Sequence, residues 1–208
     1  MHSNEVGYGL NDIEKTGLTW ILINWKVRVL KRPIYGEKIL IKTWARNSEK
    51  FYTYRDFEVL DMNNNTLAIA TTKWLLLDAK TMEIKKISEE LISKYHPENT
   101  SVFEGEAEIG KIAVPKEYSS LLTYKVQRKD IDINNHMHNV YYLDLAYETL
   151  PDDIYYNYEF NNFEIMYKKE IKLGETVKCF YSNVEDIHYV IIKSEDEKTL
   201  HSVIKFTK

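Results

Sequence analysis

The hydrophobic and polar positions of this chain follow mainly the two-residue period of β-strands. In residues 39–44 (Ile-Leu-Ile-Lys-Thr-Trp) and 188–192 (His-Tyr-Val-Ile-Ile), β-branched and aromatic side chains cluster without the 3.6-residue spacing of a helix. Short polar breaks, such as residues 47–50 and 183–186, separate runs of this kind. The pattern therefore predicts antiparallel strands joined by short turns.

One segment departs from this period. Between residues 139 and 150 the apolar positions are spaced by three and four, which predicts one helix face made of Val140, Leu143, Tyr147 and Leu150. Asn139 is a suitable N-cap, and Pro151 ends the run because proline cannot continue a helix. An antiparallel sheet that follows one apolar-faced helix suggests a sheet wrapped around that helix.

The chain contains the same unit twice. Residues 24–37 and 162–175 align at a constant offset of 138, and each copy has a Gly-Glu turn at the same place. The last two elements align at an offset of 133, a difference that turns absorb. Each copy predicts four antiparallel strands, so the sequence indicates a structural duplication.

The two copies differ at their beginnings. The second copy has a further strand, residues 121–126, ahead of its helix, whereas the first starts opposite that helix. Residues 1–17 are therefore expected to be a remnant of the first helix, with the first strand missing. Residues 88–95 predict a short helix, and 96–119 a linker that contains two prolines. The expected organisation is an N-terminal domain over 1–87, a linker over 88–119 and a C-terminal domain over 120–208.

Composition narrows the class of protein. The chain has 208 residues, 44% hydrophobic and 29% charged, which suits a large buried core. Its 28 Lys and Arg against 32 Asp and Glu give a net charge of −4, which disfavours a nucleic-acid partner. The single cysteine, Cys179, excludes an intramolecular disulfide and a cysteine-based zinc site.

The same inventory sets expectations for location and cofactors. The sequence has neither an apolar run of membrane-spanning length nor a signal-peptide pattern, so a soluble cytoplasmic protein without a membrane partner is expected. Its histidines form no metal-binding spacing, so no metal and no other cofactor is expected.

The densest polar cluster lies at residues 130–139 (Asp-Ile-Asp-Ile-Asn-Asn-His-Met-His-Asn). If this segment is extended, Asp132, Asn134 and His136 project to one side, because side chains of a strand alternate. Backbone amides near His138 and Asn139, at the start of the helix, would then be available to bind an oxyanion. The alternative is a set of ordinary turns and caps, in which Asn134-Asn135 forms a turn in its own right.

Glu170 is the second candidate for chemistry. It lies in the aligned strand pair, where the first copy has Arg32, and it follows Tyr167-Lys168-Lys169. The alternative is a solvated carboxylate, or one paired with its lysine neighbours.

These motifs together resemble those of the acyl-acyl-carrier-protein thioesterases of bacteria and plants. The resemblance rests on residues 132–142 (Asp-Ile-Asn-Asn-His-Met-His-Asn-Val-Tyr-Tyr), on 148–151 and 167–170, and in the first half on 17–22, 32–33, 43–44 and 54–57. It covers nearly the whole chain in order. It implies an α+β fold of two tandem hot-dog domains, each an antiparallel sheet around a central helix, with the first domain N-terminally incomplete.

The resemblance also assigns roles to residues. The catalytic Asp, Asn, His and Glu of the family fall on Asp132, Asn134, His136 and Glu170. Plant members have a cysteine directly after that glutamate, whereas this chain has Ile171. A cysteine mechanism therefore cannot use that position, and Cys179 is expected to be a small buried hydrophobic residue.

The resemblance implies a fatty acyl chain carried by acyl carrier protein as substrate. The acyl chain would lie in the first domain, lined by Trp20, Ile21, Trp25, Trp44 and Trp74, although any one of these could equally be core. The acidic carrier protein would be steered by Arg128, Lys129, Lys168, Lys169 and Lys172, which otherwise simply solvate the surface. A homodimer is a further alternative for a partner.

The expected reaction is hydrolysis of the thioester to a free fatty acid in fatty acid biosynthesis. His136 and Glu170 would act on water, or the Glu170 carboxylate would itself attack. Two other functions stay open, an acyl-CoA thioesterase on the same fold and a non-catalytic protein that binds acyl groups.

Overall fold

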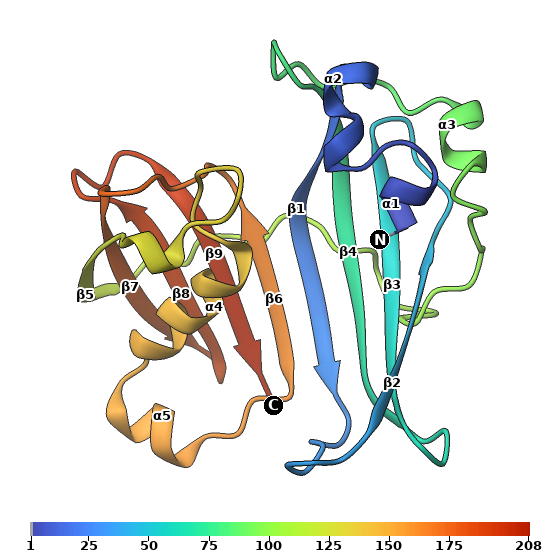
Figure 1. The fold of residues 1–208 in the computed structure, drawn as a ribbon. Coiled ribbons are helices and arrows are strands. Elements are labelled where there is room, and N and C mark those ends of the chain that lie inside the picture. The colour runs from blue at the N-terminus through green and yellow to red at the C-terminus, as the bar shows by residue number, and fades with distance from the viewer. Residues whose placement is uncertain (1) are drawn as a thin grey trace. The chain divides into compact units, whose positions relative to one another are not determined.

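The structure, a computed structural model, describes residues 2–208. The chain divides into two compact units, of which the first extends to Ile109 and the second is Gly110–Lys208. Each unit is built on antiparallel strands with few helices (Figure 1). None of the helices within residues 2–208 is long and apolar enough to cross a membrane.

The first unit contains four strands in the order β2-β3-β4-β1. They are β1 (Leu18–Val29), β2 (Ile39–Ala45), β3 (Tyr52–Asp61) and β4 (Thr66–Asp78). Its helical segments are α1 (His2–Glu5), η1 (Leu10–Asp12), α2 (Ile13–Thr16) and α3 (Glu89–Ser93). The described residues ahead of β1 therefore form separate short turns of helix, and α3 is the short helix expected at residues 88–95.

Read from β1, the order in the first unit is β1-β4-β3-β2. The second unit has the equivalent order β6-β9-β8-β7 and adds β5 at the end. Its elements are β5 (Ser119–Lys125), η2 (Arg128–Asp130), α4 (Asn139–Glu148), α5 (Asp152–Asn157), β6 (Asn162–Tyr167), β7 (Thr176–Val184), β8 (Ile187–Ser194) and β9 (Leu200–Thr207). Strands β1, β2, β3 and β4 thus correspond to β6, β7, β8 and β9. The aligned Gly36 and Gly174 both have a φ of 81°, which favours glycine. The predicted duplication is confirmed.

Helix α4 lies across one face of the sheet in the second unit (Figure 1). Its buried residues are Tyr142, Leu145 and Ala146, whereas Val140 is 55% exposed, so the predicted buried face is wrong at its first position. The helix carries apolar residues on more than one face, and spacing alone did not identify the face that the sheet covers. The predicted N-cap is also shifted by one residue, because His138 is the cap and its Nδ1 accepts from the Val140 amide at 3.2 Å.

A second helix follows that the sequence did not predict. Pro151 ends the first run as expected, but it also occupies the N-cap position of α5. Asp152 and Asp153 lie in the first turn of α5, where acidic side chains interact favourably with the helix dipole.

The region expected to be a linker divides between the two units, and its middle part is bound to the sheet of the first. We call residues 98–109 the strap. The Glu98 amide donates to the Ala45 carbonyl at 2.8 Å, and Trp44 Nε1 donates to the Thr100 carbonyl at 3.0 Å. Phe103 is buried under Lys26, whose ammonium lies 4.2 Å from the centre of the ring.

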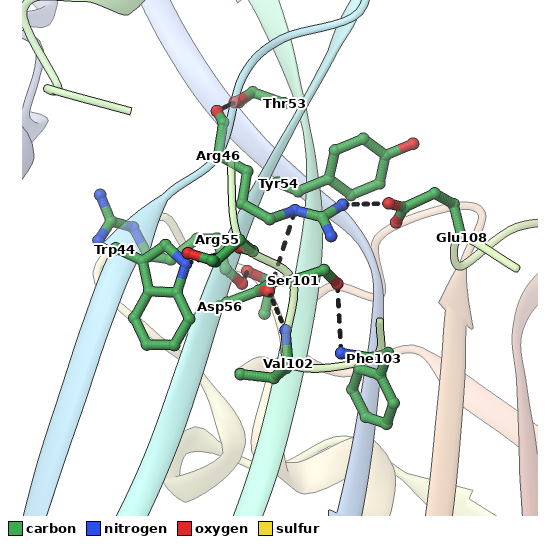
Figure 2. A network of polar contacts seen from close by, with 12 residues as sticks. Trp44, Arg46, Thr53, Tyr54, Arg55, Asp56, Ser101, Val102, Phe103 and Glu108 are labelled. Atoms are coloured by element: carbon green, nitrogen blue, oxygen red, sulfur yellow. Dashed lines mark hydrogen bonds and ion pairs between the residues drawn. The ribbon is translucent and has the colours of Figure 1, made fainter. Parts of the chain in front are cut away.

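Two buried charges anchor the strap, as Figure 2 shows. Asp56 is fully buried and accepts a hydrogen bond from the Val102 amide at 2.9 Å. Its other oxygen lies 3.7 Å from Nε of Arg46, and Nη2 of Arg46 lies 2.5 Å from Glu108. The Arg46 guanidinium also stacks on the Tyr54 ring at 4.7 Å. One carboxylate therefore holds the strap backbone and faces the arginine that binds the end of the strap.

We expect Asp56→Ala to lower the free energy of unfolding by about 3–5 kcal/mol, because it leaves Arg46 and the Val102 amide buried without this carboxylate. Chemical denaturation followed by tryptophan fluorescence measures the change. Lys198→Ala, which removes an exposed pair with Asp196, is the control and should change stability by no more than about 1 kcal/mol. A loss of similar size in both variants would contradict the role of Asp56.

Candidate functional site

The segment that carries Asp132, Asn134 and His136 is a closed turn and not an extended strand. The Asp132 amide donates to the His136 carbonyl at 2.9 Å, and the Asn135 amide donates to the Asp132 carbonyl at 3.1 Å. Asn135 has a φ of 60°, in the left-handed region that asparagine tolerates. The predicted extended geometry is therefore wrong, and the turn that the sequence left as an alternative is what the structure has.

Within this turn the Asp132 carboxylate binds the residues on either side of Asn135. One oxygen accepts from the amides of Asn134 at 2.8 Å and His136 at 3.3 Å, and the other accepts from the Asn134 side chain at 3.4 Å. Asp132 and His136 are half-buried, and Asn134 is exposed. The Asp132 carboxylate thereby fixes the backbone from which the Asn134 and His136 side chains project.

A buried carboxylate supports the turn from the N-terminal side. Asp130 is 2% exposed and accepts from the Tyr124 hydroxyl at 2.7 Å and from the Gln127 amide at 2.8 Å. Burial and this hydrogen bond raise the pKa of Tyr124 to about 12. The Asp130 carbonyl in turn accepts from the His138 amide at 2.8 Å. The sequence pattern does not reveal this role of Asp130 and Tyr124, because only the fold brings the two side chains together.

Most backbone amides at the start of α4 are already engaged. Those of His136, Met137 and His138 donate to Asp132, Ile171 and Asp130. The Val140 amide donates to the His138 ring. The His138 amide is therefore not available to bind an oxyanion, whereas the same expectation for the Asn139 amide stays a prediction.

Glu170 lies beside this turn, although not on a strand. Strand β6 ends at Tyr167, so Glu170 is in the following loop, and its predicted position in a strand is wrong. The next residue, Ile171, is fully buried, and its carbonyl accepts from the Met137 amide at 2.8 Å. His136 forms a β-bridge with Lys172. Backbone pairing therefore places the exposed Glu170 next to the turn that carries His136.

Tyr142 of α4 is 2% exposed, and its ring packs edge-on against Tyr167, the last residue of β6, with 5.1 Å between the ring centres. Burial is the main cause that raises the pKa of its hydroxyl, and the charges of Tyr167 and Glu170 add to it. The phenol is therefore neutral and within electrostatic reach of the Glu170 carboxylate. Tyr142 belongs to the motif of residues 132–142, but the sequence does not show that it is buried near Glu170.

The five residues expected to line the acyl site are not gathered in one place. Trp20 and Trp74 line a pocket of about 70 Å³ in the first unit, together with Tyr54, Arg55 and Tyr95. Ile21 alternates with Trp20 along β1, and the Trp44 indole is bound to the strap. Trp25 lies further along β1 and is half-buried.

The five residues expected to contact a carrier protein are all exposed. Arg128 and Lys129 belong to η2, just ahead of the turn, and Lys168, Lys169 and Lys172 belong to the Glu170 loop. The cations thus flank the candidate site on the second unit. Within residues 2–208, no group of three or more His, Cys, Asp and Glu side chains has the arrangement of a metal site.

Two protein-family models together match most of the chain. The model of the acyl-ACP thioesterase N-terminal domain matches residues 1–95, and that of the acyl-ACP thioesterase C-terminal domain matches residues 113–208. Oleoyl-acyl carrier protein thioesterase 1 of Arabidopsis thaliana is 24% identical over 202 residues, which are 89% of this chain and 56% of that protein. Dodecanoyl-[acyl-carrier-protein] hydrolase of Cinnamomum camphora is 25% identical, over 83% of this chain and 47% of that protein. The chain thus spans about half the length of these curated relatives.

Solved structures agree on the fold. An acyl-ACP thioesterase from Bacteroides thetaiotaomicron matches with a TM-score of 0.84 and 22% identity, over 99% of this chain and 83% of that one. The 12:0-ACP thioesterase from Umbellularia californica matches with a TM-score of 0.79 and 19% identity, over 99% and 83% of the two chains. The predicted fold class, α+β with two tandem hot-dog domains, is confirmed.

Cys179 lies apart from this site, in the core of the sheet, and is fully buried. Burial raises the pKa of its thiol to about 12, so the reactive thiolate is absent at neutral pH. We expect the native protein to react with a thiol reagent at least about a hundredfold more slowly than the protein unfolded in guanidinium. Absorbance of the released chromophore measures both rates, and equal rates would contradict the inert, buried thiol.

Proposed function

Since this chain belongs to the acyl-ACP thioesterase family, we propose that it hydrolyses the thioester between a fatty acyl chain and acyl carrier protein. The observation that carries the proposal is the pairing of two loops, which brings Glu170 beside the turn of Asp132, Asn134 and His136. A carboxylate, an amide and an imidazole on one exposed surface suit attack on a carbonyl group that a partner protein presents.

In the proposed reaction Glu170 and His136 take a proton from a water molecule, whose oxygen adds to the thioester carbonyl. The carbonyl oxygen becomes an oxyanion, and the side-chain amide of Asn134 donates to it, because the backbone amides of His136, Met137 and His138 are engaged. Collapse of this intermediate breaks the carbon–sulfur bond, and the carrier thiolate leaves and takes up the proton. The products are a free fatty acid and the carrier thiol.

In a second route the Glu170 carboxylate attacks the thioester carbonyl, the carbon–sulfur bond breaks, and the carrier thiolate leaves as an acyl-carboxylate anhydride forms. Water then hydrolyses the anhydride, which releases the fatty acid and the Glu170 carboxylate, and the proton that water gives up goes to the carrier thiolate. In both routes Asp132 orients Asn134 and His136 through the amides that it binds.

On the substrate side, we propose that the acyl chain enters the first unit and reaches the pocket of Trp20 and Trp74. The aromatic residues of this small pocket suit the end of an apolar chain, whereas Trp44 has a structural role in binding the strap. The cytoplasmic location and the homodimer expected from the sequence stay predictions.

We expect His136→Ala and Glu170→Gln each to lower kcat by about 10²- to 10⁴-fold, because each removes a group that accepts a proton. Release of carrier thiol from acyl carrier protein loaded with chains of several lengths measures the rates. His138→Asn and Glu175→Gln are matched controls, since the first keeps the helix cap and the second keeps an acceptor for the Lys172 amide. Near-normal turnover in either test variant would refute the assignment. A clear preference for coenzyme A thioesters would favour the acyl-CoA thioesterase.

The cations beside the site give a separate test of the carrier protein as substrate. We expect Lys168→Glu combined with Lys172→Glu to raise KM for the acyl carrier protein thioester by roughly tenfold, because both charges face an acidic partner. KM for a small acyl thioester should stay the same. Lys198→Glu, on the β8–β9 turn, is the control. If added salt and all of these substitutions leave KM unchanged, charge does not steer the substrate.

A further inference from the structure

His201, at the second position of β9, connects that strand to the loop that carries Glu170. It is 4% exposed. Its carbonyl accepts from the Lys168 amide at 2.8 Å and from the Lys169 amide at 3.3 Å. Its ring nitrogen Nδ1 lies 3.0 Å from the Lys169 carbonyl, and because a carbonyl only accepts, Nδ1 is the donor. One buried residue therefore makes three hydrogen bonds to the two residues ahead of Glu170.

These bonds begin where the regular sheet ends. The β6–β9 ladder stops at the pair Tyr167–Ser202, and the chain then leaves the sheet through Lys168 and Lys169. Beyond this point the regular β6–β9 ladder offers no backbone donor to the Lys169 carbonyl. The imidazole supplies the donor that the ladder no longer provides, so the loop departs from the sheet at a fixed place.

Both neighbours of Glu170 are thereby held. Lys169 is bound by the His201 ring, and Ile171 is buried with its carbonyl bound by the Met137 amide. Glu170 is exposed, and its side chain makes none of these bonds. The position of its carboxylate relative to the His136 turn therefore depends on the two fixed peptide groups beside it.

We propose that His201 is a positioning residue for Glu170, which acts through the Lys169 carbonyl and touches no substrate. The inference rests on the proposed thioesterase function, in which Glu170 must lie at a set distance from the reacting carbonyl. A displacement of about 1 Å in such a group costs on the order of 100-fold in rate.

Asparagine and glutamine separate this role from simple packing. The side-chain nitrogen of asparagine reaches the place of Nδ1, whereas that of glutamine reaches the place of Nε2. His201→Asn can therefore donate to the Lys169 carbonyl, and His201→Gln and His201→Leu cannot.

We expect His201→Gln and His201→Leu to lower kcat by about 10- to 100-fold with KM for the acyl carrier protein thioester changed less than about twofold. His201→Asn should keep kcat within about threefold of wild type. In a Glu170→Gln background, His201→Leu should cause no further loss, because the group that it positions is already absent.

The matched control is His188→Leu, which removes another fully buried histidine of the same sheet whose Nδ1 contacts the Tyr181 hydroxyl at 2.7 Å. This variant should lose stability and keep kcat when assayed well below its melting temperature. If it loses as much kcat as His201→Leu, or if His201→Asn is as impaired as His201→Leu, the positioning role is overturned.

Amide hydrogen exchange gives a readout that does not depend on activity or on a stable leucine variant. Residues 168–172 should exchange faster in His201→Gln than in wild type, and His201→Asn should restore slow exchange. Equal exchange in all three proteins overturns the proposal even if the enzyme is active. If wild type hydrolyses no acyl thioester, the proposed function fails, and the exchange pattern alone then decides whether His201 holds the loop.

Discussion

The candidate site depends on a short stretch of backbone pairing between two loops of the second unit. The Met137 amide donates to the Ile171 carbonyl, and His136 pairs with Lys172. Both segments lie outside the strands, and Glu170 itself is exposed. This pairing therefore holds the loop of Glu170 beside the turn of Asp132, Asn134 and His136. Burial of Ile171 stabilises the pairing, because removing it would expose a large apolar side chain.

Around this pairing the structure separates buried polar groups that hold the backbone from exposed groups that are free to meet a substrate. Asp130 and His201 are almost fully buried, and each is hydrogen-bonded to main-chain groups of the loops. A buried polar group that lost its partner would be costly, so such contacts fix geometry strongly. The first unit uses the same device for another purpose, since the buried Asp56 holds the strap of residues 98–109. The residues proposed to act on the substrate are thus different from those that hold the backbone.

Secondary structure followed from local pattern where the pattern was unambiguous. The clustering of β-branched and aromatic residues predicted the strands of both copies, and the repeat predicted that they share one order, because side-chain period and turn residues act locally. A helix was predicted over residues 139–150, and the face expected to be buried was wrong at Val140. Val140 and Tyr142 are both apolar enough to be buried, and only the position of the sheet decides between them.

The sequence by itself determined the strands, the duplication, the class of fold and the set of residues that resembles a catalytic motif. Tertiary structure decided that Asp132 closes a turn, that Glu170 leaves the strand, and that the expected linker is bound to a sheet. It also decided that His201, far from the motif in sequence, supports the Glu170 loop. The physical reason is the separation along the chain over which each interaction acts. Backbone propensity and side-chain period are set by neighbouring residues, whereas burial and hydrogen bonds between distant segments exist only once the chain has folded.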